Sequence, residues 1–297
     1  MSLATRRTAL AATAFLAVGL GSTAARADDL VVYCGVQEEW CQAMMNAFTK
    51  ETGIKVAMTR KSAGETYAQV KAESANPKGD VWWGGTGDAF LQAAEDGLLA
   101  EYKSAKLAEL HPWAQRQAAD AQYRAVGIYA GGLGFAVNTE ILAKKKVKEP
   151  ACWADLIKPE FKGEVQIANP NSSGTAYATL ATLVQIFGEN QAFDFMKKLH
   201  GNVSQYTKSG AAPAVAAGRG EASVGVVFMH DSVVQTIGGF PVKTVAPCEG
   251  TGYEVGSMGI IKGGPNLELA KKFYEFALTP KAQLTAAQAK SYQVQAN

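Results

Sequence analysis

The stretch LVVYCGVQEEWCQAMMNAFTKETGIKVAMTR, residues 30–60, decides the fold class. It opens with an apolar run over 30–35 that is typical of a buried strand. Residues 38–53 carry apolar side chains at helical spacing and end on Gly53, a residue type common just beyond a helix end. A second strand pattern covers 54–60. This order predicts two parallel strands joined by a helix.

The same alternation continues toward residue 100. A helix is expected over 63–79, stopped by Pro77 and Gly79, then a strand over 80–85 and a helix over 88–99. We therefore expect an α/β fold with a parallel sheet covered by helices on both faces. Ligands bind at the carboxyl ends of strands in such sheets.

Two long extended runs, 123–142 and 253–263, bracket a second α/β block. They predict two lobes joined by two hinge strands, with a ligand cleft between the lobes. Lobe 1 would be discontinuous, over 28–125 plus 258–297, and lobe 2 would cover 126–257.

The N-terminus has the pattern of a signal peptide over residues 1–27. Arg6 and Arg7 precede an apolar run from about residue 9 to residue 20, and Ala25-Arg26-Ala27 is a cleavage motif. We expect cleavage after Ala27 and export to the periplasm, by the general secretory route or the twin-arginine route. No later run reaches the roughly 18 apolar residues that a spanning helix needs.

The charge of the exported chain is close to zero. Residues 1–27 hold three of the 29 basic residues and none of the 27 acidic ones, which leaves 26 against 27, a net charge of −1. The sequence has no stripe of Lys and Arg residues of the kind that indicates a nucleic-acid partner. We expect a monomer.

Four cysteines in an exported chain suggest disulfides, and they permit three pairings. Cys34 and Cys41 lie seven residues apart, and a Cys152–Cys248 bridge would then close the second lobe. One or both pairs could instead be reduced. None of the four has a zinc-type spacing.

Polar loops that open onto helices are candidate anion sites, because the N–H groups of the first helical turn lack helical partners. The loop at 168–175 carries Ser172, Ser173 and Thr175 before an apolar helix, and Lys208 precedes an Ala-rich helix. Ser62 and Thr86 also stand at expected helix starts. Ordinary helix capping is the alternative for these hydroxyl residues.

His230 and Asp231 end the apolar run at 224–228. No G-x-S-x-G motif accompanies them, and adjacent residues cannot easily form the oriented His–Asp pair of a triad. A paired donor and acceptor suits sugar hydroxyls. The alternative is a surface helix start capped by Asp231. Glu254 would lie in the hinge as a further hydroxyl acceptor, or in a hinge salt bridge.

The chain resembles the periplasmic solute-binding proteins of ABC importers, in the group related to ferric-iron-binding proteins. The resemblance covers about residues 30–295 and rests on LVVYCGVQEEW…AFTKETGIKV, DVWWGGTGDAFLQAAEDGLLAEY, GFAVNT, CWADLIKPEFKGEVQIANPNSSGTAY and AVAAGRGEASVGVVF. It implies a type 2 periplasmic-binding fold, capture of a solute without catalysis, and delivery to an inner-membrane permease.

The ligands of the iron binders are missing. Phe228-Met229-His230 stands where they carry two tyrosines, Gln37 where they carry a histidine, and Gly85 where they carry a glutamate. Fe(III) prefers anionic oxygen ligands such as phenolates. We therefore expect no resident metal and no cofactor.

The pattern instead resembles the hexose-phosphate-binding branch of this group. That resemblance implies that His230, Asp231 and Glu254 hold sugar hydroxyls. Ser62, Thr86, Ser173, Thr175 and Lys208 would line the phosphate end, with Gln37, Ser172 and Gly174 completing the predicted contacts. A ferric-iron, phosphonate, phosphoglycerate or thiamine carrier remains an alternative, and a cleft hydrolase using Cys34 and His230 a distant one. Relatives of this type usually continue beyond residue 297 with a further Pro-rich segment and a closing helix.

Overall fold

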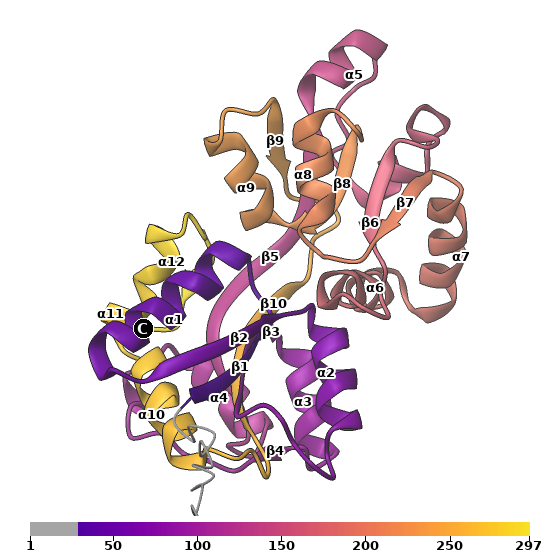
Figure 1. Ribbon diagram of the computed structural model, residues 1–297. Coiled ribbons are helices and arrows are strands. Elements are labelled where there is room, and N and C mark those ends of the chain that lie inside the picture. The colour runs from indigo at the N-terminus through magenta and orange to yellow at the C-terminus, as the bar shows by residue number, and fades with distance from the viewer. Residues whose placement is uncertain (1–28) are drawn as a thin grey trace, which may run out of the picture.

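The computed structural model describes residues 29–297. The predicted signal peptide lies outside the described residues. The chain forms two α/β lobes joined by β5 (Val126–Asn138) and β10 (Tyr253–Ile261), which run side by side from one lobe to the other (Figure 1). The predicted fold class, with two hinge strands, is confirmed.

Lobe 1 is built on β1 (Asp29–Cys34), which pairs in parallel with β2 (Lys55–Arg60) and β3 (Val81–Thr86). The predicted parallel arrangement is confirmed, and β10 then joins β3 in the antiparallel direction. The other elements of this lobe are α1 (Glu38–Thr52), α2 (Ala63–Ala72), α3 (Gly87–Glu95), β4 (Leu99–Ala100), a 3-10 turn at Leu107–Glu109, α4 (Pro112–Asp120), α10 (Leu267–Ala277), α11 (Pro280–Gln283), α12 (Thr285–Gln288) and β11 (Val294–Gln295).

Helix α1 forms as its pattern predicts. Trp40, Met44 and Phe48 lie four residues apart and are buried on one face. The helix ends because Gly53 adopts the left-handed conformation, φ 74°, and donates its N–H to the Thr49 carbonyl at 2.8 Å.

The predicted helix over 88–99 is wrong at its end. Helix α3 stops at Glu95, and Gly97 turns the chain at φ 70°. Leu99 is buried and belongs to β4, which pairs with β10. Pairing with a strand that is distant in sequence therefore overrides the local helical pattern. Helix α2 likewise ends at Ala72, before the Pro77 that was expected to stop it.

Lobe 2 uses the far half of β5. Beyond Leu133, β5 pairs with β8 (Val224–Phe228) and β9 (Val242–Val245), and β6 (Val165–Ala168) lies between β8 and β7 (Val203–Thr207). Its helical elements are α5 (Thr139–Lys145), 3-10 turns at Trp153–Ile157 and Pro159–Phe161, α6 (Gly174–Phe187), α7 (Glu189–His200), α8 (Ala212–Arg219) and α9 (Met229–Ile237).

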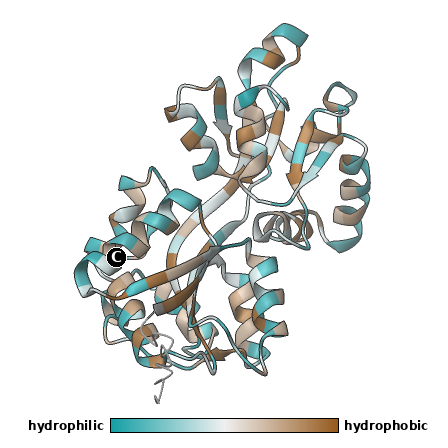
Figure 2. Cartoon of the chain, in the orientation of Figure 1, coloured by the Kyte–Doolittle hydropathy of each residue, from teal (hydrophilic) through white to brown (hydrophobic). Residues whose placement is uncertain are grey.

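Each lobe has apolar side chains packed on both faces of its sheet. In lobe 1, Trp40 and Phe273 belong to one cluster, and Trp82 and Phe90 belong to another. In lobe 2, the larger cluster includes Phe135, and the smaller packs α8 against β5, β8 and β9. Figure 2 shows the hydrophobic strands inside and hydrophilic residues on the outer helices. The lobe boundaries predicted at 125/126 and 257/258 remain predictions.

Both predicted disulfides are present, Cys34–Cys41 and Cys152–Cys248. Among residues 29–297, no helix combines the length and apolar character needed to cross a membrane.

Candidate functional site

A cleft lies between the lobes, where strand ends of lobe 1 face helix starts of lobe 2. About 450 Å³ of space free of protein atoms lies among its lining residues, part of it open to solvent. The residues that line it are Gly35, Val36, Gln37, Arg60, Ser62, Ala63, Gly85, Thr86, Tyr129, Ser173, Gly174, Thr175, Gly210, Ala211, Phe228, His230, Asp231, Glu254 and Gln293.

The start of α6 forms one end of the cleft. Ser173 occupies the N-cap position, yet its hydroxyl makes no capping hydrogen bond. A Cβ on Gly174 would lie 2.0 Å from Thr86 Oγ1, so the missing side chain lets the helix end approach lobe 1. Thr86 Oγ1 is buried and has no hydrogen-bond partner among residues 29–297. Helix N–H groups and free hydroxyls at one point suit a bound anion.

Arg60 brings a positive charge to this end, from the carboxyl terminus of β2. Its Nε donates to the Val36 carbonyl at 3.0 Å, and its Nη2 lies 3.5 Å from Ser209 Oγ in lobe 2. The predicted site did not include Arg60, although its place at the end of a parallel strand was the signal that could have found it.

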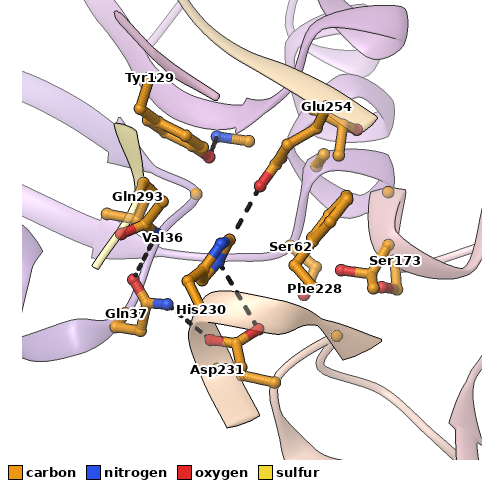
Figure 3. Close-up of a pocket in the computed structure, with 18 of the residues that line it drawn as sticks. Val36, Gln37, Ser62, Tyr129, Ser173, Phe228, His230, Asp231, Glu254 and Gln293 are labelled. Carbon is orange, nitrogen blue, oxygen red and sulfur yellow. Dashed lines mark hydrogen bonds and ion pairs between the residues drawn. The ribbon is translucent and has the colours of Figure 1, made fainter. Parts of the chain in front are cut away.

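His230, Asp231 and Glu254 form the other end of the cleft (Figure 3). His230 and Asp231 lie in the first turn of α9, and Glu254 comes from β10. His230 Nε2 is 3.8 Å from Asp231 Oδ2 and 4.0 Å from Glu254 Oε1. All three side chains are buried, so the predicted alternative of a surface helix start is wrong, and the N-cap is Phe228 rather than Asp231.

Burial sets the protonation of this group. Loss of solvent lowers the pKa of His230 below 6.5, against the opposing effect of Asp231. Loss of solvent, together with the charges of Asp231 and Asp88, raises the pKa of Glu254 well above 4.5. Burial therefore disfavours the charged forms of His230 and Glu254, and the uncharged forms can exchange hydrogen bonds with hydroxyl groups.

The lobes touch across the cleft, so the structure is a closed form. Gln37 Nε2 donates to Asp231 Oδ1 at 2.6 Å, and the Gly64 N–H donates to the Ser172 carbonyl at 3.2 Å. Lys208 Nζ lies 2.6 Å from Glu65 Oε1.

Most of the predicted ligand contacts come together. Gln37, Ser62, Thr86, Ser173, Gly174, Thr175, His230, Asp231 and Glu254 all line the cleft. Two predicted contacts do not line it. The hydroxyl of Ser172 bonds to backbone carbonyls at Asn169 and Lys208, and the Lys208 side chain is 78% exposed and pairs with Glu65.

Besides Arg60, the predicted site lacked Tyr129 and Gln293. The Tyr129 hydroxyl accepts the Gly85 N–H at 3.1 Å, and burial, aided by the charge of Glu254, raises its pKa well above 10. Tyr129 lies in the extended run at 123–142, and an aromatic residue in that hinge strand was the signal that could have found it. Nothing in the sequence pointed to Gln293.

Residues 76–297 match the model of the family described as bacterial extracellular solute-binding proteins. An uncharacterized protein of Haemophilus influenzae is 49% identical over 275 residues, covering 91% of this chain and 79% of that protein. A Salmonella typhimurium protein described as a putative 2-aminoethylphosphonate-binding periplasmic protein is 27% identical, over 82% of this chain and 70% of its own.

A solved structure is also similar. The periplasmic binding protein AfuA of Actinobacillus pleuropneumoniae, solved with fructose 6-phosphate bound, is 45% identical, with a TM-score of 0.88. The alignment covers 91% of this chain and 85% of AfuA.

Proposed function

Because the chain belongs to the bacterial extracellular solute-binding proteins, which are periplasmic components of ABC transporters, we propose that it captures a hexose phosphate. Members of this family bind a small solute and work with a membrane permease; they are binding proteins and not enzymes. The phosphorylated sugar is the part that we propose.

The observation that carries the proposal is the chemical division of the closed cleft. At one end stand the start of α6, the free Ser173 hydroxyl and Arg60, which together suit a phosphate. At the other end stand Asp231, together with His230 and Glu254, whose charged forms are disfavoured by burial; these side chains suit hydroxyl groups. A solute with a phosphate at one end and several hydroxyls at the other matches both. The fructose 6-phosphate in AfuA supports the same class of ligand.

The alternatives fit this cleft less well. A ferric site of phenolate type needs ionised tyrosines, but Tyr129, the tyrosine among the lining residues, has a raised pKa. A thiamine site would need an aromatic stack, and Phe228 in the lining already stacks on His230. The hydrolase alternative fails because Cys34 is bonded to Cys41. A phosphonate remains the second candidate, since a Salmonella relative carries that description.

Capture would proceed by lobe closure. β5 and β10 flex as hinges, the solute contacts both lobes, and its differential affinity stabilises the closed form. The closed protein would then present both lobes to the permease.

Calorimetric titration of ligand-free protein tests the proposal. Glucose 6-phosphate should bind more tightly than glucose, inorganic phosphate, 2-aminoethylphosphonate, thiamine or Fe(III)-citrate. Ser173→Ala and His230→Ala should each weaken its binding by about 10-fold, because each removes a hydrogen bond to the solute. Binding of the phosphonate, thiamine or iron alone would refute the sugar phosphate.

Two matched variants test whether a cation inside the cleft contributes more to phosphate binding than a cation on its rim. Arg60→Gln removes a charge that lines the cleft and should weaken glucose 6-phosphate by about 10- to 100-fold, because hydrogen bonds to charged groups are the stronger ones. Lys208→Gln removes an exposed ion pair and should cost about 5-fold or less. Equal losses would contradict this placement of the phosphate.

A further inference from the structure

We propose that Ser291 and Gln293 are positioning residues, which hold the Gln37 side chain against Asp231 and so tune the hydroxyl end of the cleft. The proposal rests on the proposed function. It assigns a role in solute selection to the C-terminal segment, residues 291–297, which lies more than 250 residues from Gln37 in the chain.

The side-chain amide of Gln37 is held on both sides. Its Oε1 accepts Gln293 Nε2 at 3.2 Å, and its Nε2 donates to Asp231 Oδ1 at 2.6 Å (Figure 3). The Ser291 hydroxyl also lies 2.9 Å from Gln37 Oε1. Donors of the C-terminal segment at the amide oxygen restrict the orientation of the amide. Its nitrogen is therefore directed at Asp231 before the lobes close.

The donors themselves are buried. Ser291 is 3% exposed and Gln293 is 8% exposed. Buried polar side chains are costly unless their hydrogen bonds are met. The Ser291 hydroxyl has one hydrogen and two acceptors within reach, Gln37 Oε1 at 2.9 Å and Gln293 Oε1 at 2.5 Å, so it donates to one of them at a time. Either bond holds Gln37, directly in the first case and through Gln293 Nε2 in the second.

The C-terminal segment is fixed to lobe 1 beside the hinge. β11 pairs with Tyr129 and Ala130 of β5, and the Ala296 N–H donates to the Ile128 carbonyl at 3.1 Å. Asp231 belongs to lobe 2. The contact between Gln37 and Asp231 therefore joins the lobes, and the C-terminal segment holds the Gln37 side chain from lobe 1.

Holding Gln37 in place fixes the orientation of the Asp231 carboxylate. With Oδ1 bound to Gln37, Oδ2 is left 3.8 Å from His230 and free for a solute hydroxyl. Loosening Gln37 would release Asp231 from this orientation. The phosphate end, at Arg60 and α6, would be unaffected.

Double-mutant cycles on glucose 6-phosphate affinity test the proposal. Gln293→Met and Ser291→Ala should each weaken binding by about 10-fold, the effect of a lost hydrogen bond that orients a charged group. Gln293→Met should add no further loss in a Gln37→Ala background, because its effect acts through Gln37. It should add fully in a Ser173→Ala background, because Ser173 lies at the start of α6 in the other lobe. Ser291→Thr retains the hydroxyl and should retain affinity.

A purely structural role predicts a different result. A variant that merely loosens the lobe would add its loss in both backgrounds and lower the melting temperature in proportion, and that result overturns the proposal. Unchanged affinity in Gln293→Met and Ser291→Ala overturns it as well. If glucose 6-phosphate does not bind the wild type, the proposed function fails. The same cycles are then run with whichever solute of the calorimetric panel binds, so the two ideas fail separately.

Discussion

Two titratable side chains face each other in the closed cleft with opposite shifts. The pKa of His230 is lowered and that of Glu254 is raised, both chiefly by burial. In an open cleft, water would return both toward their ordinary values of 6.5 and 4.5. Lobe closure is therefore linked to the binding or release of a proton at each of these two residues.

The contributions of Glu254 and His230 to closure depend on pH in opposite directions. The closed form keeps the Glu254 proton, so this contribution to closure is complete below pH 4.5 and is lost as pH rises through the raised pKa. The closed form excludes a His230 proton, so that contribution is present above pH 6.5 and is lost as pH falls. Above pH 6.5, the Glu254 contribution alone should therefore vary.

We predict that glucose 6-phosphate affinity falls as pH rises from 6.5, by up to about 10-fold per pH unit, the limit for one linked proton. Glu254→Gln should remove this slope, because its amide is neutral throughout. Calorimetry on both proteins measures it, and the ratio of the two profiles cancels the titration of the phosphate itself. Parallel profiles would show that Glu254 does not carry the proton.

At the scale of elements, the approach of α6 to β3 controls how far the lobes close. Gly174→Ala would place a Cβ 2.0 Å from Thr86 Oγ1, across the lobe interface. Overpacking of this kind costs about 1–3 kcal/mol, so solute affinity should fall about 10- to 100-fold. The melting temperature of the ligand-free protein should change little, because the clash arises on closure.

X-ray scattering at saturating glucose 6-phosphate checks the cause. The wild type should become more compact, and Gly174→Ala should contract less. Gly201→Ala is the control, since Gly201 has ordinary helical angles at the end of α7 and its nearest neighbour would be the Lys198 carbonyl at 3.2 Å. If Gly174→Ala closes and binds like this control, the contact with Thr86 does not limit closure.

The elements also show what the sequence could predict. The strand ends that bring Gln37, Ser62 and Thr86 together follow from the alternation of strands and helices, because a parallel sheet collects its carboxyl ends at one edge. The extended runs at β5 and β10 were long and punctuated by glycine, and they predicted the crossing between lobes. Such features are local, or follow from a rule about the fold.

The errors arise where side-chain direction or a distant segment decides. Lys208 precedes the Ala-rich helix α8 as expected, but its side chain lies on the rim facing Glu65 and not at the phosphate end. Gln293 reaches the cleft because β11 pairs with β5, a pairing that the short sequence of β11 does not signal. A part of the cleft that forms by packing between distant segments cannot be predicted from the sequence of either segment alone.

At the scale of the molecule, the two disulfides constrain very different lengths of chain. Cys152–Cys248 spans 96 residues and holds the loop before β10 to the 3-10 turn at Trp153–Ile157, where Glu249 also accepts the Trp153 N–H at 2.8 Å. Cys34–Cys41 spans seven residues beside the cleft. Neither Cys152 nor Cys248 lines the cleft.

We predict that the two bridges separate stability from binding. In the chain-entropy model, a loop of about 100 residues is worth about 4.7 kcal/mol and one of about eight residues about 2.5 kcal/mol. Cys152→Ala with Cys248→Ala should therefore lower the free energy of unfolding more, yet leave glucose 6-phosphate affinity within about 3-fold. Cys34→Ala with Cys41→Ala should also weaken binding, because Cys34 precedes Gly35 in the cleft wall. Denaturant unfolding and calorimetry measure the two effects. A large loss of affinity in the Cys152/Cys248 variant would contradict this separation and would mean that the bridge in lobe 2 is needed for solute binding.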